Sequence, residues 1–193
     1  MISSPSGGGK TTVFRAILKW RPMYRYSVSV TTRPPRRNET HGNDYFFISD
    51  DEFDNKIESG EFAEWAWVHG YRYGTLEQSI NDALDTGDVI IFDLDVQGAD
   101  SIKKAFPEEA ILIFILPPSR EELSRRLYAR KTDMQDVIEQ RIKNADEEVR
   151  RIYEYDYLVV NDALETCIDN VDSIISAELC RPGRILPIEG WQL

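Results

Sequence analysis

The chain has 193 residues, of which 41% are hydrophobic and 30% are charged, and its net charge is -11. This length suits one domain with a substantial core, and this composition excludes a disordered chain. Acidic residues (34) outnumber basic ones (23), so no general affinity for nucleic acid is expected.

The chain has apolar runs that are far too short for a membrane span, and its first residues lack the pattern of a signal peptide. We therefore expect a cytoplasmic protein that has no membrane partner. The two cysteines, Cys167 and Cys180, lack the spacing of a zinc site and are expected to be reduced thiols.

Short apolar runs alternate with amphipathic stretches along the chain. Runs typical of strands are found at 26–30, 45–48, 62–68, 89–94, 111–116 and 157–160. Stretches with helical spacing are found at 11–19, 51–59, 76–85, 121–128, 137–153 and 164–179. The runs at 89–94 and 111–116 are apolar almost throughout, as in parallel strands covered on both faces. The pattern predicts an α/β fold with a parallel sheet flanked by helices.

The region 44–68 differs from this core because polar and apolar residues alternate in it and aromatic residues are frequent. We expect it to form a small, partly exposed antiparallel insertion. Two helix starts have the form of a capping box, in which Ser or Thr is followed three residues later by Glu or Gln: Ser119 with Glu122, and Thr75 with Gln78. The last residues, 181–193, are expected to form an irregular tail.

The opening stretch MISSPSGGGKTT has the composition of a phosphate-binding loop. Backbone N–H groups in a glycine-rich turn bind anions, and the helix that follows adds the positive end of its dipole. Lys10 would reach the β- and γ-phosphates of ATP, and the Thr11 hydroxyl would bind Mg²⁺. Ser4 stands where the usual pattern has its first glycine, but the Lys and Thr remain. A flexible glycine-rich terminus is the alternative, and the apolar spacing after the loop argues against it.

The strand that should lead into this loop is nearly missing, since only two or three residues precede it. We expect the natural chain to begin several residues upstream of Met1.

A second element agrees with the phosphate-binding loop. The apolar run at 89–94 ends in two acids, Asp93 and Asp95, which fall on the same face of a strand. Such a segment holds Mg²⁺ directly or through water in P-loop proteins. A core strand that merely meets solvent at acidic residues is the alternative interpretation.

Seven stretches resemble the guanylate kinase family, in order from residue 2 to about residue 180. They are 4–11 (SPSGGGKT), 27–36 (SVSVTTRPPR), 41–47 (HGNDYFF), 61–66 (EFAEWA), 73–75 (YGT), 93–98 (DLDVQG) and 160–162 (VND). A phosphate-binding loop alone would indicate only a superfamily, whereas this ordered series is specific.

The resemblance implies a single P-loop domain that transfers the γ-phosphoryl group of ATP to GMP or dGMP, with Mg²⁺ as cofactor. It implies a core at 1–30, 80–118 and 142–180, a GMP-binding insertion at 31–79, a helical lid at 119–141 and the tail at 181–193.

The resemblance also assigns residues by position. It places Arg33, Arg36, Tyr45 and Tyr73 at the GMP phosphate, and Ser29, Glu64, Thr75 and Asp95 around guanine. It places ATP at Ser6, Gly7, Gly8, Gly9, Lys10, Thr11, Thr12 and Asn161, and Mg²⁺ at Thr11 and Asp93. The transferred phosphate would be met by Lys10, Arg33, Arg126, Arg130 and Arg141. Lys131 stands where lids of this family usually have glycine, so lid flexibility is expected to differ.

The chemistry of these residues is consistent with those roles. Guanidinium groups and tyrosine hydroxyls suit a phosphate that carries nearly two charges. An ionised Glu64 could accept hydrogen bonds from both N1–H and N2–H₂ of guanine, whereas the N1 acceptor of adenine would leave it unpaired. For the arginine cluster at 33–37, a solvated basic turn or a nucleic-acid patch is the alternative, and Glu64 alone could be merely exposed.

Two other functions remain open from the sequence. Guanylate-kinase-like domains of scaffold proteins bind peptides without catalysis, but they typically lack an intact phosphate-binding loop. A kinase for another phosphorylated acceptor, such as ribose bisphosphate, is the second, and Glu64, Tyr73 and Thr75 together argue for guanine instead.

Overall fold

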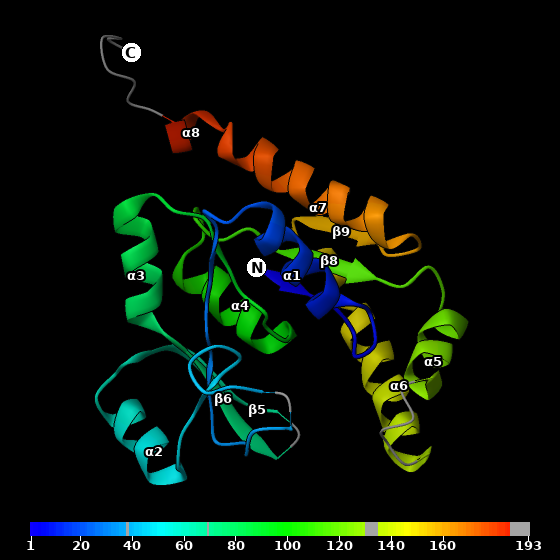
Figure 1. The fold of residues 1–193 in the computed structure, drawn as a ribbon, viewed down its shortest axis with the longest axis horizontal. Coiled ribbons are helices and arrows are strands. Elements are labelled where there is room, and N and C mark those ends of the chain that lie inside the picture. The colour runs from blue at the N-terminus through cyan, green and yellow to red at the C-terminus, as the bar shows by residue number, and fades with distance from the viewer. Residues whose placement is uncertain (38, 69, 130–134, 186–193) are drawn as a thin grey trace.

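The computed structural model describes residues 1–37, 39–68, 70–129 and 135–185 (Figure 1). Parallel strands form its central layer: β1 (Ile2–Ser3), β2 (Arg25–Tyr26), β7 (Ile90–Ile91), β8 (Ile113–Leu116) and β9 (Tyr157–Val160). The order β1-β8-β9 makes one group and β2-β7 the other. A parallel bridge between Ile2 and Asp93 links the two groups, so the ends of β1 and β7 lie side by side.

Helices cover both faces of this layer because alternate strand residues point to opposite sides. On one face, α1 (Lys10–Trp20) and α7 (Leu164–Leu179) pack against Ile113 and Ile115 of β8. On the other face, α3 (Glu77–Thr86) and α4 (Val96–Ala105) pack against Leu112 and its neighbours. Figure 1 shows α7 in orange beside β8 and β9, with α3 and α4 in green on the opposite side.

A second, mixed sheet projects from this core, with the strand order β4-β3-β6-β5. Its strands are β3 (Val30–Thr31), β4 (Phe46–Phe47), β5 (Phe62–Val68) and β6 (Tyr71–Leu76). β3 pairs parallel with β4, and β6 pairs antiparallel with both β3 and β5. Helix α2 (Asp50–Glu58) packs on this sheet, where Phe53 stacks on Phe62 at 4.5 Å between ring centroids.

Two further helices, α5 (Arg120–Ala129) and α6 (Gln135–Val149), form a separate projection. They pack through Leu123, Leu127, Ile138 and Ala145. Figure 1 shows this pair and the mixed sheet at the same end of the molecule, on either side of the loop before α1. The chain then passes through the short 3-10 helix η1 (Ile152–Glu154) to β9, and after α7 it forms α8 (Pro182–Ile185).

Most predicted elements are present. The ranges 62–68, 157–160 and 164–179 match β5, β9 and α7. The run at 26–30 is divided between β2 and β3, because the chain leaves the parallel layer there and enters the mixed sheet. The helical stretch at 137–153 ends as an α-helix at Val149.

β6 and α4 are among the elements that the sequence analysis did not predict. β6 contains Gly74 and several polar residues, yet it pairs on both sides, which overrides its weak local preference. α4 contains Gly98 and has no long apolar run, and its start is fixed instead by Asp95 as N-cap.

Two local predictions need correction. Thr75 does not cap a helix: it lies in β6, and α3 begins at Glu77 without a side-chain cap. The Thr75 hydroxyl donates to Glu64 instead. The tail at 181–193 is not irregular throughout, because α8 forms within it, and residues 186–193 lie outside the described part. Ser119 does accept from the Glu122 backbone N–H, at 3.1 Å.

Candidate active site

The loop between β1 and α1 forms the predicted phosphate cradle. Gly7 and Gly9 have φ values of 93° and 97°, a left-handed conformation that favours glycine. The Gly8 backbone N–H donates to Pro5 O at 2.8 Å, and α1 begins directly after Gly9. Ser4 packs against this turn, since a Cβ at Gly8 would lie 2.8 Å from Ser4 Cβ. The loop thus leads directly into the N-terminus of α1, the positive end of the helix dipole, which favours an anion.

Lys10 is held at the end of β7, next to the cradle. Its ammonium group lies 2.5 Å from Asp93 Oδ1 and donates to Leu94 O at 2.8 Å. The two charged side chains are only 18% and 13% exposed. A cation and a carboxylate therefore lie side by side between the cradle and the end of β7.

The predicted Mg²⁺ ligands are compatible with this arrangement. Thr11 follows Lys10 in the first turn of α1, and Asp93 is the partner of Lys10. Hydroxyl and carboxylate oxygens are suitable ligands for Mg²⁺, which usually takes one or two protein oxygens together with phosphates and water. Among the described residues, no group of three or more His, Cys, Asp or Glu side chains is placed to hold a metal ion.

Arg33 is a buried guanidinium group fixed by several partners. It donates to the Tyr73 hydroxyl at 3.0 Å, to Glu39 at 2.9 Å and to the Pro34 carbonyl at 2.8 Å. Its Cζ lies 5.5 Å from the centre of the Tyr45 ring. Burial raises the pKa of the Tyr45 hydroxyl well above its usual range, so this group stays protonated and can donate. These residues present donors to an anion.

Arg36 belongs to the same cluster but is held differently. Its side chain is 71% exposed, and Glu39 lies 3.9 Å away. The sequence analysis did not single out Glu39, which binds both the Arg33 guanidinium group and the Arg36 backbone N–H. Its only sequence signal is a carboxylate three residues after Arg36.

Glu64 is a buried carboxyl group at the other end of the site, with 9% of its surface exposed. The Thr75 hydroxyl donates to Glu64 Oε1 at 2.6 Å. The start of α4 lies against the same group, because a Cβ at Gly98 would be 3.1 Å from Oε2. Burial raises the pKa of Glu64 to about 7, the Asp95 charge adds to this rise, and the Thr75 hydrogen bond opposes it.

Asp95 and Ser29 flank Glu64. Asp95 Oδ1 accepts from the backbone N–H groups of Gln97 and Gly98, at 3.1 and 2.8 Å, and so caps α4. Ser29 is buried, and its carbonyl accepts from Phe46 N at 2.9 Å. Both residues therefore have structural contacts in addition to their place in the site.

A cavity of about 310 Å³ brings these groups together at the carboxyl ends of β1 and β7. It joins the cradle, the mixed sheet and α6. Of the predicted site residues, it is lined by Ser6, Lys10, Ser29, Arg33, Arg36, Tyr45, Glu64, Tyr73, Asp93, Asp95 and Arg141.

The remaining predicted residues lie around this cavity. Thr75 stands behind Glu64, and the others on the ATP side belong to the cradle and to α1: Gly7, Gly8, Gly9, Thr11 and Thr12. Arg130 and Lys131 lie outside the described residues.

Asn161 and Arg126 connect the cradle to α5. Asn161 donates through Nδ2 to Gly8 O at 2.8 Å, and its own carbonyl accepts from Arg126 Nη2 at 2.9 Å. Arg126 also donates to Glu122 at 2.7 Å. Asn161 thus supports the cradle, and its predicted place beside the ATP base stays a prediction.

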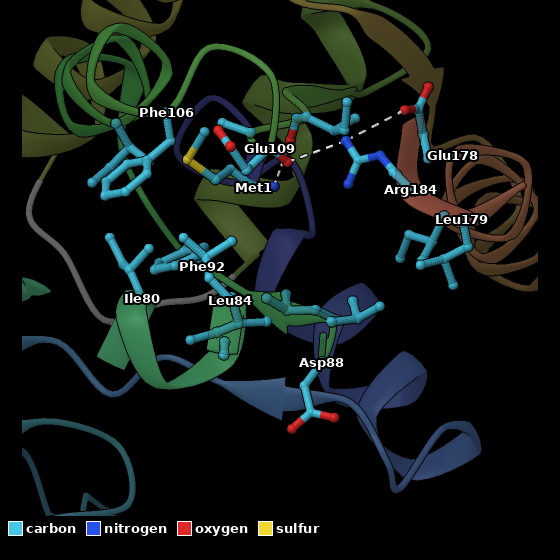
Figure 2. A pocket seen from close by; sticks show the side chains of 18 of the residues that line it. Met1, Ile80, Leu84, Asp88, Phe92, Phe106, Glu109, Glu178, Leu179 and Arg184 are labelled. Carbon is cyan, nitrogen blue, oxygen red and sulfur yellow. Dashed lines mark hydrogen bonds and ion pairs between the residues drawn. The ribbon is translucent and has the colours of Figure 1, made fainter. Parts of the chain in front are cut away.

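A second cavity, of about 410 Å³, lies at the opposite, amino ends of the strands (Figure 2). Apolar side chains such as Ile80, Phe92 and Phe106 line it, and Arg184 at its side donates to Glu109 O at 3.2 Å and lies 3.7 Å from Glu178. Ligands of open parallel sheets bind at the carboxyl ends of the strands. The smaller, polar cavity is therefore the candidate active site.

No helix in the described ranges is long and apolar enough to cross a membrane.

A phosphate cradle between a parallel strand and a helix, with Asp93 just after the neighbouring strand β7, is typical of P-loop proteins. A solved structure agrees with this fold. Shikimate kinase from Bacteroides thetaiotaomicron has the same fold, with a TM-score of 0.51 at 13% identity over 91% of this chain and 96% of that chain.

Proteins with a higher sequence identity to this chain identify the family. The crystal structure of guanylate kinase from Anaplasma phagocytophilum matches with a TM-score of 0.80 and 34% identity, over 95% of this chain and 86% of that chain. Guanylate kinases from Geobacter metallireducens and Myxococcus xanthus are 48% and 46% identical, over 96% of this chain and 91% and 88% of theirs. The guanylate kinase family model matches residues 1–178. The chain belongs to the guanylate kinase family.

Proposed function

We propose that this chain transfers the γ-phosphoryl group of ATP to GMP, and to dGMP, in the cavity that Lys10, Arg33 and Glu64 line. One observation carries the proposal. A buried carboxyl group, a fixed guanidinium group and the lysine of the cradle all line a single cavity. The cavity thus has groups that are complementary to guanine, to the phosphate of GMP and to the phosphates of ATP.

The guanidinium end suits the phosphate of GMP. Arg33 is already oriented by Tyr73 and Glu39, so little side-chain entropy remains to be lost when it binds an anion. Arg36 is exposed and can close on the phosphate after it enters. Tyr45 and Tyr73 supply neutral donors beside these charges.

The carboxyl end suits guanine. Glu64 Oε1 is oriented by the Thr75 hydroxyl, and the ionised group can accept from N1–H and N2–H₂. Ser29 and Asp95 line the same part of the cavity and offer further polar contacts. Ribose bisphosphate has no base, so it lacks the adjacent N1–H and N2–H₂ donors that this buried carboxylate could accept together.

ATP would lie along the cradle, with its phosphates on the backbone of residues 6–12 and its base near Asn161. Mg²⁺ would be held by Thr11 and Asp93, and when bound it supplies charge neutralisation between the phosphates. Lys10 would exchange Asp93 for the β- and γ-phosphates. Because Lys10 and Arg141 line one cavity with Arg33, these three can share the charge of the transferred group.

The proposed reaction also assigns a role to each region of the chain. The core would comprise 1–30, 80–118 and 142–180, the GMP-binding insertion 31–79 and the lid 119–141. The lid would bring Arg126 and Arg130 toward the phosphates, since Arg126 already contacts the residue that supports the cradle. A peptide-binding role finds no support in an arrangement that keeps Lys10 and the cradle intact. Because the reaction consumes ATP, we place it in the cytoplasm.

Product identification tests the proposal. The chain is incubated with ATP, Mg²⁺ and GMP, and the nucleotides are separated by chromatography. We expect GDP and ADP in a one-to-one ratio, with almost no ADP when GMP is left out. ADP release without any GDP would reject the proposed function.

A further inference from the structure

Asn161 is a buried residue whose amide lies against the phosphate cradle. It follows β9 directly, and its backbone N–H donates to Leu116 O at 2.7 Å, which continues the pairing of β9 with β8. The residue is only 4% exposed, and its Nδ2 atom donates to Gly8 O at 2.8 Å. The end of the parallel sheet therefore holds this amide in contact with the backbone of the cradle.

The next residue of the cradle, Gly9, contacts the same amide. A Cβ at Gly9 would overlap Asn161 Nδ2, and Gly9 has a φ of 97°, which side chains rarely adopt. The backbone and the amide thus meet with no room for a side chain between them. Because the contact extends over two successive residues of the loop, it fixes the peptide group that joins Gly8 to Gly9.

The orientation of that peptide group determines where its donor points. A peptide bond is planar and trans, so the Gly8 carbonyl and the Gly9 N–H point in opposite directions. Because Asn161 holds the carbonyl, the N–H points to the other side of the loop, away from the amide. Backbone N–H groups of a glycine-rich loop before a helix are the donors that bind phosphate oxygens. The amide thus sets the direction of one such donor.

Helix α5 supports both partners of this contact. Arg126 Nη2 donates to the backbone carbonyl of Asn161 at 2.9 Å. Leu123 and Leu127 lie against Gly7, where a Cβ would be 3.1 and 3.0 Å from their methyl carbons. A loop that is held both by a strand end and by a helix has its shape before an anion arrives, which lowers the entropy lost on binding.

We propose that Asn161 is a positioning residue for ATP, which orients the peptide group between Gly8 and Gly9 so that the cradle presents this backbone donor to the ATP phosphates. The proposal rests on the proposed function, because that function places ATP on the cradle. In this role Asn161 acts through the loop. Contact with the ATP base, which the family resemblance implies, is the competing role, and it would make Asn161 important for the nucleoside and not for the phosphates.

Binding of inorganic tripolyphosphate separates the two roles, because this ligand has the phosphates of ATP but no base. Its affinity is compared by calorimetry with that of an ATP analogue that has a methylene bridge between the β- and γ-phosphorus atoms and cannot transfer its phosphoryl group. Both titrations contain Mg²⁺ and saturating GMP, which keeps the added ligand out of the arginine cluster at 33–37. The variants are Asn161→Ala, Asn161→Leu, which keeps the approximate volume, and Asn170→Ala, the matched control at an exposed position of α7.

We expect Asn161→Ala and Asn161→Leu to weaken the binding of both ligands by the same factor, about 10-fold, because each leaves the Gly8 carbonyl without its donor. The affinity for GMP, measured alone, should change less than about twofold, as for a distant and independent site. Asn170→Ala should match the unsubstituted chain. All chains are compared at a temperature at which their melting curves show them folded.

Three results would overturn the proposal. Weaker binding of the ATP analogue with unchanged binding of tripolyphosphate would assign Asn161 to the base. An equal loss of affinity for GMP would show a merely structural role, and unchanged affinity for all three ligands would leave the amide without a role in binding. GDP formation by the unsubstituted chain tests the proposed function separately, because these binding measurements involve no turnover.

Discussion

The Thr75 hydroxyl donates a hydrogen bond of 2.6 Å to Glu64, and both residues are buried. This contact ties β6 to β5 at the point where the mixed sheet faces the cavity. It also sets the charge of the site, since it opposes the rise in the Glu64 pKa that burial causes. In the proposed function, the choice of guanine would therefore depend on a pair of residues and not on the carboxylate alone.

The raised pKa of Glu64 predicts how activity depends on pH. With a pKa of about 7 in the free enzyme, Glu64 is increasingly protonated below pH 7 and can then accept fewer hydrogen bonds from guanine. We expect kcat/KM for GMP to fall as pH is lowered from 8 to 6. Glu64→Gln should have a lower kcat/KM and a flatter profile over this range. An unchanged pH profile in that variant would assign the dependence to another group.

The same shift predicts a stability effect of the opposite sign. The folded chain holds the Glu64 proton up to a pKa of about 7, whereas the unfolded chain loses it near 4.5. The folded state thus binds more protons between these values, and the free energy of unfolding falls as pH rises through this window. For Glu64 alone this amounts to at most about 3 kcal/mol. Urea unfolding at pH 5 and pH 7.5 should show a smaller difference for Glu64→Gln.

Lys10→Ala is expected to separate turnover from binding. Lys10 contacts Asp93 and the Leu94 carbonyl, and neither of these is proposed to bind GMP. Turnover should fall by about 10²-fold or more, as for other preorganised charges at a transition state. The affinity for GMP, measured by calorimetry without ATP, should change little. Normal turnover in this variant would refute the assignment of the cradle.

Arg33 and Arg36 should differ when each is replaced by alanine. Both are expected to raise KM for GMP. Arg33→Ala should also lower the free energy of unfolding by about 1 to 3 kcal/mol, because it leaves buried polar partners unpaired. Arg36 is 71% exposed, so Arg36→Ala should change stability by less than about 0.5 kcal/mol. Equal loss of stability in the two variants would contradict the structure.

Arg72 lies in the mixed sheet but outside the cavity, so its replacement is a control that should affect stability and not turnover. It is 6% exposed, forms ion pairs with Asp50 and Asp54, and lies 4.7 Å over the Phe53 ring. Arg72→Ala should lower the free energy of unfolding by about 1 to 3 kcal/mol through lost packing and pairing. Because Arg72 does not line the cavity, kcat at a temperature where the variant is folded should stay close to normal. A specific loss of kcat would give Arg72 a role in the site.

The sequence predicted the parts of the site that local patterns encode. The cradle at residues 7–10 and the acids after β7 are contiguous in the chain, so their spacing alone places them. Arg33, Glu64 and Tyr73 were assigned by resemblance, and the structure places all three on one cavity. Their shared location depends on β6, whose pairing with two strands is a tertiary effect that no local pattern contains.

The contacts that support the site were harder to predict. Thr75 has the spacing of a helix cap, but it lies in β6, and its hydroxyl donates to the buried carboxylate of Glu64. Glu148 belongs to a stretch of acidic residues on an amphipathic helix, and only the packing of α6 shows that its Oε2 atom is buried. In both cases the structure depends on residues that are distant in the sequence, which local patterns do not reveal.

The most direct test of the central claim is the choice of acceptor. A coupled assay of ADP release compares GMP, dGMP, AMP and ribose 1,5-bisphosphate at equal concentrations with saturating ATP and Mg²⁺. We predict the fastest turnover with GMP, measurable turnover with dGMP and very little with AMP or ribose 1,5-bisphosphate. Faster turnover with either of the last two would contradict the account of Glu64 and Arg33 as a guanine nucleotide site.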